Sequence, residues 1–239
     1  MPRTIKILCS TDDLLVVDKP SGLVIHRSQQ ARDSYTLLDC LKQQLHGPVF
    51  PVNRLDRGTS GVIVLGRTRE AARELSLAFQ NQQVTKTYLA LVRGWPEPLS
   101  IDALLDQKTA VTRTETLARF EQPWPNQRFA TARYALIVAY PERGIHHQIR
   151  RHLRSAGFPV LGDGQHGDKE HNRLFETHLG ISRLLLHSWR LELPYRQRVR
   201  QFTAALPGRL RGMLARLGAE QNLLNSLAES TLDAPHQHG

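Results

Sequence analysis

The sequence of 239 residues is poor in cysteine, with only Cys9 and Cys40. Two thiols exclude a scaffold held by several disulfides, and they exclude a zinc or iron–sulfur site built from four cysteines. So low a cysteine content is typical of a reducing compartment, and we expect a cytoplasmic protein. No apolar run approaches the roughly 18 to 20 residues needed to cross a bilayer, so a membrane protein is not expected.

Several common catalytic signatures are also missing. The chain has no Gly-x-x-x-x-Gly-Lys-Ser/Thr loop for nucleotide phosphates, no Gly-x-Gly-x-x-Gly turn for a dinucleotide and no Gly-x-Ser-x-Gly elbow. Residues 163–168 place acidic groups near glycines without the spacing of a calcium loop. His147 and His152 are five residues apart, which fits helical zinc sites poorly. We therefore expect neither a metal nor a cofactor.

Positive charge is what the chain has in excess. Lys and Arg number 32 against 22 Asp and Glu, which gives a formal net charge of +10. Such an excess indicates a polyanionic partner, and nucleic acid is the commonest one. A membrane surface fits less well, because no helical segment gathers Lys and Arg on one polar face. A soluble enzyme that is simply basic remains an alternative at this point.

Strand-like and helix-like segments mix without a regular βαβ alternation, which favours an α+β fold. Apolar runs predict strands at 5–8, 14–18, 22–26, 62–65, 84–92, 130–139 and 184–193. Helical spacing predicts helices at 36–45, 68–83, 147–156 and 207–227. Thr36 or Ser34 is the expected N-cap of the first helix and Thr68 that of the second. The polar stretch 100–121 predicts short strands with exposed connections, and 231–239 predicts a frayed tail.

The most informative segment runs from residue 53 to residue 61 and places Asp56 between Arg54 and Arg57. A turn would account for it, because Asp accepts backbone hydrogen bonds and Gly supplies positive φ. An Asp that neighbouring Arg residues keep ionised is also available as a nucleophile or a base. The residues alone leave both interpretations open.

Asn53-Arg54-Leu55-Asp56-Arg57-Gly58-Thr59-Ser60-Gly61 resembles the catalytic signature of the RluA-type pseudouridine synthases, which isomerise uridine in RNA to its C-glycoside. Other segments resemble further motifs of that family in the same order: 13–26, 86–90, 147–153, 159–163 and 184–187. Segments 26–28, 92–95, 162–168 and 172–173 are most similar to the tRNA pseudouridine-65 synthase branch. The resemblance implies the pseudouridine synthase fold, a single catalytic domain over residues 1–230. This fold has a mixed, largely antiparallel central sheet, flanking helices and an RNA-binding cleft.

The resemblance implies three catalytic residues. Asp56 starts C–N cleavage, either by attack at the ribose C1′ or by action at C2′. Tyr88 stacks on the flipped uracil, and Arg150 pairs with the catalytic Asp. By pattern alone, Tyr88 also fits a strand aromatic that faces the core, and Arg150 fits a helix-surface arginine. The implied substrate-binding residues are Arg54, Leu186, Arg57, Lys86, His147, Gln148 and Arg151.

Two positions depart from the family pattern. Asn53 stands where many members carry His, and Ile145 stands where an Arg is usual, so the phosphate or base contact of that Arg is in question. The candidate phosphate contacts are Lys19, Arg27, Arg57, Arg151, His152, Arg154 and His166.

The implied partner is RNA, with tRNA expected first and ribosomal RNA as the alternative, bound by a monomeric enzyme. An RNA-binding or RNA-chaperone protein without catalysis is the alternative from another class. The intact set of Asp56, Tyr88 and Arg150 favours the enzyme, because RNA binding alone would not require it.

Overall fold

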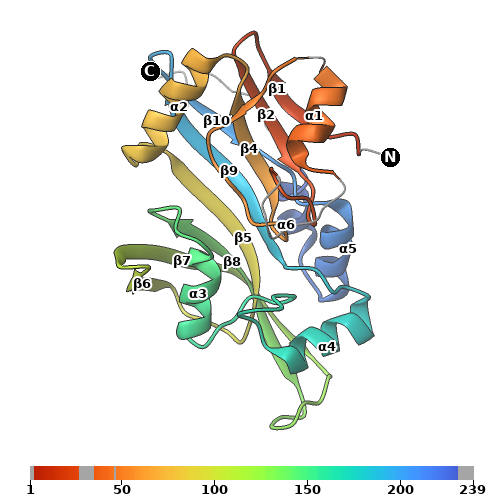
Figure 1. Cartoon of the computed structure of the whole chain (residues 1–239). Helices are drawn as coiled ribbons and strands as arrows, with labels where there is room; N and C mark the ends of the chain where they lie inside the picture. Colours follow the sequence, from red (N-terminus) through yellow and green to blue (C-terminus); the bar gives the residue numbers. More distant parts are fainter. Residues whose placement is uncertain (1–2, 27–34, 46, 231–239) are drawn as a thin grey trace. The chain divides into compact units, whose positions relative to one another are not determined.

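The computed structural model describes residues 3–26, 35–45 and 47–230 (Figure 1). The expected tail, 231–239, lies outside these residues. The chain divides into two compact units, which we describe one at a time. Unit 1 holds Met1–Lys86, Ser188–Ala205 and Ser230–Gly239, and unit 2 holds Thr87–His187 and Leu206–Glu229. No helix in the described part of the chain has both the length and the apolar character that crossing a bilayer requires.

Unit 1 is built on the strands β1 (Lys6–Ser10), β2 (Leu14–Lys19), β4 (Ser60–Gly66) and β9 (Leu186–Tyr195), which follow one another in that order. The first two residues of β9 are counted in unit 2. β3 (Phe50–Pro51) pairs with β4, and β10 (Arg198–Thr203) pairs with β9, both antiparallel. Every residue of β4 is buried. Burial on both faces explains why this strand is an unbroken apolar run without alternation.

In the described part of unit 1, both helices begin at predicted N-caps. The Thr36 hydroxyl accepts a hydrogen bond from the Asp39 amide at 3.1 Å, and the Asp39 carboxylate accepts one from the Thr36 amide, which starts α1 (Leu37–Leu45). The alternative cap, Ser34, lies outside the described residues. The Thr68 hydroxyl accepts from the Ala71 amide and starts α2 (Arg69–Gln80). Both helix predictions are confirmed.

Unit 2 is built on the strands β5 (Thr85–Arg93), β8 (Ala132–Pro141), β7 (Lys108–Gln122) and β6 (Leu99–Leu105), in that order and with antiparallel pairing. β6 and β7 are joined by Asp106 and Gln107, both at positive φ, which is the two-residue hairpin that matches strand twist. β7 has 15 residues whose exposed and buried positions largely alternate. The prediction of only short strands at 100–121 was wrong, because one polar, solvent-facing side hid a long strand.

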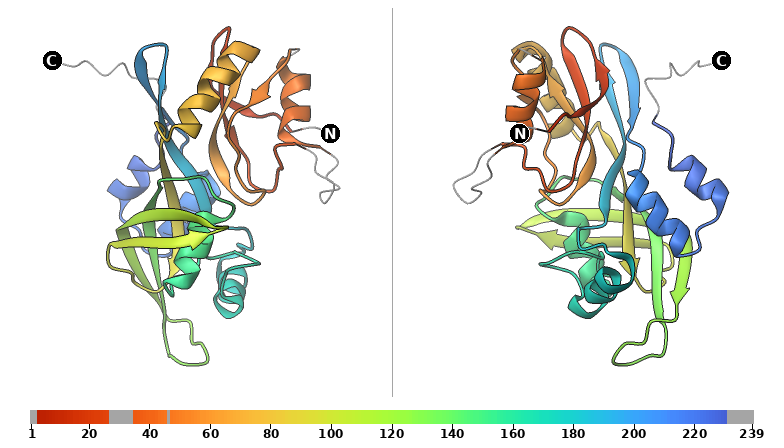
Figure 2. Two further views of the ribbon diagram at one scale, coloured as in Figure 1. Left: turned by 60° about the vertical axis from the view of Figure 1, so that its left-hand side comes forward. Right: turned by 90° about the vertical axis from the view of Figure 1, so that its right-hand side faces the viewer.

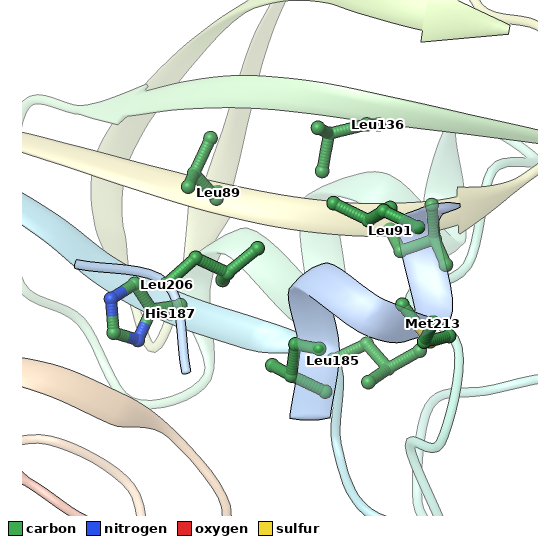
Figure 3. A pocket seen from close by; sticks show the side chains of 9 residues that line it. Leu89, Leu91, Leu136, Leu185, His187, Leu206 and Met213 are labelled. Atoms are coloured by element: carbon green, nitrogen blue, oxygen red, sulfur yellow. The ribbon is translucent and has the colours of Figure 1, made fainter. Parts of the chain in front are cut away.

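Four helices belong to unit 2: α3 (Gln148–Ser155), α4 (Lys169–Leu179), α5 (Gly208–Arg216) and α6 (Gln221–Ser226). α3 packs Ile149 and Leu153 in one cluster with Ala90 of β5. Leu89 and Leu91 alternate with Ala90 along β5, so their side chains lie on the face of the sheet opposite to that of Ala90. Helix α5 covers this second face. A small cavity of about 20 Å³ remains under α5 (Figure 3).

Four further segments differ from the sequence predictions. Residues 22–26 form no strand, because the carbonyls of Val24 and Ile25 accept hydrogen bonds from the amides of Leu37 and Leu38 at the start of α1. That prediction was wrong. The predicted helix at 207–227 is interrupted at Gly218, whose φ is +98°. Helix α4 and strand β10 were not predicted at all. The largely antiparallel α+β architecture itself is confirmed.

Candidate active site

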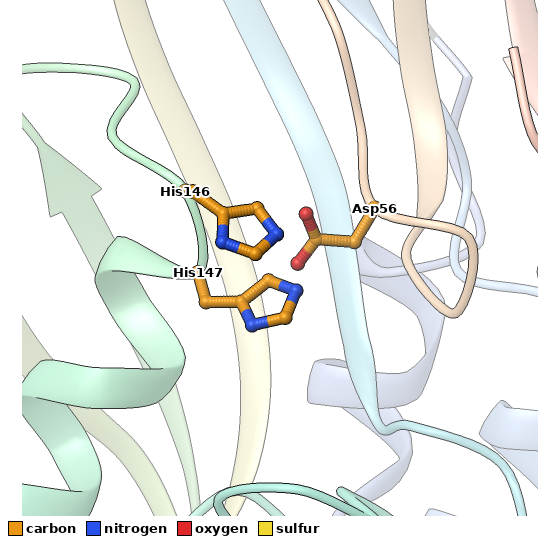
Figure 4. Close-up of side chains that lie close together, drawn as sticks. All are labelled: Asp56, His146 and His147. Carbon is orange, nitrogen blue, oxygen red and sulfur yellow. The ribbon is translucent and has the colours of Figure 1, made fainter. Parts of the chain in front are cut away.

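Asp56 lies in unit 1 on the loop between β3 and β4 (Figure 4). Its neighbour Leu55 is buried, whereas Arg54 and Arg57 are exposed and Asp56 is half-buried. The amide of Thr59 donates to the carbonyl of Asp56 at 3.1 Å, which closes a turn. The loop therefore presents one carboxylate between two solvent-facing guanidinium groups while Leu55 fixes it to the core.

A buried lysine holds this loop from beneath. Lys19 is fully buried, and its ammonium donates to the carbonyls of Leu23 at 2.8 Å, Pro20 at 3.1 Å and Arg57 at 3.3 Å. The Gly22 amide also donates to the Arg57 carbonyl, and the Ser21 hydroxyl donates to the Gly58 carbonyl. Lys19 was predicted to contact phosphate. That prediction was wrong, because the buried Lys19 ammonium donates its hydrogen bonds to backbone carbonyls of two loops of the protein.

Asn53 and Gly61 fix the two ends of the Asp56 loop. The Asn53 side-chain oxygen accepts a hydrogen bond from the Val64 amide at 3.2 Å, so this departure from the family pattern ties the loop to β4. Gly61 has a φ of +112°, and a Cβ there would lie 2.1 Å from the Ser188 carbonyl oxygen. No other residue type fits that position, because both the backbone angle and the space require glycine.

In unit 2, Tyr88 and Leu186 belong to one hydrophobic cluster. Leu186 is buried in it, and Tyr88 is half-buried at its edge, together with Ile149 from α3. Tyr88 is thus less enclosed than a core aromatic, and its ring lies beside the buried Leu186 cluster. Lys86 is half-buried two residues earlier on β5.

Arg150 projects from α3 and forms a buried ion pair with Asp163. Its Nε lies 2.6 Å from Asp163 Oδ2, and its Nη2 lies 2.8 Å from Oδ1. The arginine side chain is 9% exposed and the aspartate side chain 0% exposed. This bidentate geometry fixes the plane and direction of the guanidinium group. The surface-arginine interpretation of Arg150 was therefore wrong.

The backbone directly after Asp163 folds around the Asp163 carboxylate. The backbone amides of Gln165 and His166 donate to Asp163 Oδ1 at 2.9 and 3.0 Å. Burial raises the pKa of Asp163, but the hydrogen bonds from Arg150 and from these amides outweigh it and hold the pKa below its ordinary value. Asp163 is ionised at neutral pH and serves as the fixed counter-charge of Arg150.

Two histidines stand at the start of α3. The rings of His146 and His147 stack with their centroids 3.7 Å apart (Figure 4), and His147 Nδ1 lies 3.0 Å from His166 Nε2. Burial is the main cause that lowers the pKa of His166, and the nearby charges of Arg150 and Arg151 add to it, while Asp163 opposes it. The imidazole of His166 is consequently neutral at pH 7.

Gln148 and His152 both bind the same strand, β7. The Gln148 amide nitrogen donates to the Val111 carbonyl and to the Thr112 hydroxyl, and its oxygen accepts from the Ile145 amide. His152 is fully buried and its Nδ1 lies 2.9 Å from the Thr112 hydroxyl. The prediction that His152 contacts phosphate was wrong. A substrate contact for Gln148 stays a prediction.

The other candidate phosphate contacts that the structure describes are at least partly accessible. Arg151 reaches Asp106 at 2.9 Å on the surface, and Arg154 donates to the Gly167 carbonyl. Arg57 is exposed and donates to the Gly22 carbonyl. Arg27 lies outside the described residues.

The site residues are therefore distributed over both units. Unit 1 holds Asp56, Arg54, Arg57 and Lys86, and unit 2 holds Tyr88, Leu186, His147, Gln148, Arg150 and Arg151. Sequence reasoning assigned no role to Asp163, and it assigned Lys19 to phosphate instead of to the backbone carbonyls that it holds. For Asp163 a signal was present, since it ends one of the segments that resemble family motifs.

The sequence pattern of the family described as RNA pseudouridylate synthase matches residues 13–155, more than half of the chain. The chain belongs to the RNA pseudouridylate synthase family.

Two curated relatives carry the name tRNA pseudouridine synthase C. The protein from Vibrio cholerae is 35% identical over 92% of this chain and 98% of its own, and that from Pasteurella multocida is 38% identical over 79% and 85%. Among solved structures, human RNA pseudouridylate synthase domain containing 4 has a TM-score of 0.69 at 26% identity, covering 90% of this chain and 94% of its own. Domain containing 1 reaches a TM-score of 0.74 at 22% identity, covering 98% of each chain. The expected pseudouridine synthase fold is confirmed.

Proposed function

We propose that this protein is an RNA pseudouridine synthase that converts a uridine of tRNA to pseudouridine, at a position of the 65 type. The observation that carries the proposal is the match to the Vibrio cholerae relative, which extends over nearly the whole of both chains. The net charge of +10 supports a polyanionic substrate. No relative named here points to ribosomal RNA.

In the reaction, the ribose C1′ exchanges its bond to uracil N1 for a bond to uracil C5. The N1–C1′ bond breaks, the base turns, the C5–C1′ bond forms, C5 loses its proton and N1 gains one. The reaction is an isomerisation, so no redox group and no co-substrate is required. The target base must leave its stack, which costs a few kcal/mol that phosphate contacts can offset.

Asp56 is the group that we assign to the start of C–N cleavage, as nucleophile at C1′ or as base toward C2′. Its support is the family signature in residues 53–61 together with a loop that Lys19, Leu55 and Gly61 hold in place. A carboxylate that the fold already holds in position loses less entropy on reaching the reacting atom than a carboxylate on a flexible loop.

Arg150 is the residue that we assign to the catalytic carboxylate as its ion-pair partner. Its support is the family motif at 147–150 and the fixed orientation that Asp163 gives to the guanidinium plane. Tyr88 and Leu186 are assigned to the two faces of the flipped uracil, on the support of their common cluster. Arg54 is assigned to the space that the flipped nucleotide leaves, and Arg57, Lys86, His147, Gln148 and Arg151 to contacts with the substrate.

The decisive variant is Asp56→Asn. We expect it to abolish pseudouridine formation in a tRNA transcript while the affinity for that transcript changes less than about threefold, since only one charge of many is altered. Asp12→Asn, at an exposed aspartate of unit 1, is the matched control and retains activity. Pseudouridine formation by Asp56→Asn at the wild-type rate would refute the catalytic assignment.

A carbodiimide-based pseudouridine map of RNA from cells that lack this chain tests the substrate. Loss of one pseudouridine from tRNA is expected. Loss from ribosomal RNA with tRNA unchanged would instead establish the ribosomal alternative, and purified protein that binds RNA but modifies neither class would establish the non-catalytic one.

Three further expectations belong to the same proposal. We assign residues 1–230 to a single catalytic domain, because the family pattern at 13–155 draws on both units. We also expect the enzyme to be a monomer. A cytoplasmic location is expected because the chain has only two cysteines. Light scattering of the purified chain and fractionation of cells that express a tagged copy test them.

A further inference from the structure

Unit 2 holds a second cavity that none of the assigned site residues lines. It measures about 660 Å³, within the range of roughly 300–1,000 Å³ that is usual for small-ligand sites. Its walls are the loop 123–131 between β7 and β8, the end of β5 and the start of α4. We call it the loop cavity. Figure 2 shows the 123–131 loop extending beyond the strands that it joins.

The loop presents a phenylalanine to solvent on an ordered turn. Phe129 is 69% exposed and lines the loop cavity. The Asn126 side-chain oxygen accepts hydrogen bonds from the backbone amides of Arg128 and Phe129. The backbone amide of Asn126 donates to the Phe129 carbonyl, which closes the turn. The Gln127 amide donates to the Glu170 carboxylate of α4 at 2.8 Å. The exposed Phe129 ring adds little to the stability of the fold, because most of its apolar surface stays in contact with water.

Two cations that line the same cavity have no acidic partner among the residues that the structure describes. Arg128 and Lys169 are both exposed and line the loop cavity. The other two cations of the lining are engaged, since Arg93 pairs with Asp168 and Arg133 stacks on Trp95 and contacts Glu121. Asp168 in turn accepts from the first amides of α4, so those amides do not hold a ligand.

This combination is specific in its chemistry. An exposed aromatic ring offers a stacking surface for a base, and every nucleobase has a face that can use it. Cations that pair with no acidic group in the described part of the chain, and that line the same cavity, suit the phosphate of the same nucleotide. A duplex buries its bases in stacks, so only an unpaired nucleotide can use both features.

We propose that the loop cavity binds an unpaired nucleotide of the RNA substrate, with its base on Phe129 and its phosphate between Arg128 and Lys169. This inference rests on the proposed function, because it takes the partner to be the RNA that the enzyme modifies. The nucleotide is a different one from the uridine that is isomerised, and its capture anchors the RNA at a second point.

The test measures RNA affinity and catalysis separately. Phe129→Ala should raise the KM for a tRNA transcript, and the Kd for a short fluorescein-labelled oligoadenylate, by about five- to a hundredfold, which is the range for one lost stacked base. The kcat at saturating transcript should not change. Phe129→Trp should retain both constants, because it preserves the stacking face. Leu104→Ala, at an apolar residue of β6 that is 74% exposed, is the matched control and should have no effect.

The phosphate part has its own measurement. Arg128→Ala should lower the slope of log affinity against log salt for the oligoadenylate by about 0.7, the value for one phosphate contact on a single strand. Arg73→Ala, at an exposed arginine of α2, removes the same charge elsewhere and should leave the slope unchanged.

Two outcomes overturn the inference. One is a Phe129→Ala protein whose KM and Kd stay within twofold of the wild type. The other is competition for the site by a blunt RNA duplex but not by the single strand. Because oligoadenylate contains no uridine, its binding is measured without any catalysis. If the wild type formed no pseudouridine while Phe129→Ala still weakened oligoadenylate binding, the proposed function would fail and the loop cavity would stand as a nucleotide site.

Discussion

Arg150 and Asp163 are joined by two parallel hydrogen bonds of 2.6 and 2.8 Å in the interior of unit 2. The next residue of the same helix, Arg151, makes the opposite kind of pair, a single surface contact with Asp106, whose side chain is 57% exposed. The two arginines thus provide an internal comparison between a buried and a solvated ion pair on one helix.

Asp163→Asn should lower the free energy of unfolding by about 3–5 kcal/mol, because it leaves the Arg150 charge buried without its main counter-charge. Asp106→Asn should cost less than about 1 kcal/mol, since water screens the surface pair. Urea denaturation of the two variants and the wild type supplies the values. Equal losses for both variants would contradict the distinction between the pairs.

The stabilisation by Asp163 should depend on pH. Its pKa is lower in the folded protein than the ordinary value, so the contribution is complete above the unfolded-state pKa of about 4 and disappears as pH falls through the folded-state value. The difference in Tm between the wild type and Asp163→Asn should therefore be constant from pH 7 to about pH 5 and shrink below about pH 4. A difference that grows on acidification would have the wrong sign and exclude this origin.

Much of the fold follows from local pattern. The helix predicted at 68–83 is found at Arg69–Gln80, because its Thr68 cap and its apolar spacing are both short-range signals. α4 escaped prediction because only His171 and Phe175 of its 11 residues are buried, which leaves too narrow an apolar stripe to recognise. The same limit applies to β7, where one face is solvated.

The candidate site shows a different limit. Its residues were found by resemblance, but their bonding partners are distant in sequence. Lys19 binds the Arg57 carbonyl 38 positions away, and Arg150 binds the Asp163 carboxylate 13 positions away. Whether a basic residue meets phosphate or a buried carbonyl is decided by which loops the fold brings together. Charge and spacing do not contain that information, so Lys19 and His152 were assigned to the wrong partner.

Lys19→Met tests whether the buried ammonium positions the Asp56 loop. The variant preserves the length of the side chain but leaves the carbonyls of Leu23, Pro20 and Arg57 without their shared donor, at a cost of about 1–3 kcal/mol. The kcat should fall by roughly ten- to a hundredfold because the carboxylate is misplaced, while the KM for tRNA changes little.

Lys42→Met, at an exposed lysine of α1, is the control for charge alone and should leave kcat unchanged. If Lys19→Met instead raised KM and made RNA binding less dependent on salt, Lys19 would be a phosphate contact after all, and its buried position would not describe the RNA-bound enzyme.

Ile145→Arg tests the departure at the start of α3. Ile145 is half-buried, and its backbone amide and carbonyl both bond to Gln148, so a new side chain leaves those bonds in place. If the arginine that is usual there contacts phosphate, the variant should bind tRNA about fivefold more tightly, close to the 1 kcal/mol upper range of an exposed ion pair. Its salt slope should be steeper by about 0.7 to 0.9, the increment for one added phosphate contact. Ile145→Gln, which is long and polar but uncharged, should reproduce neither change. An unchanged slope in Ile145→Arg would mean that this position faces no phosphate in the complex, and that the chain lost the arginine without losing a contact.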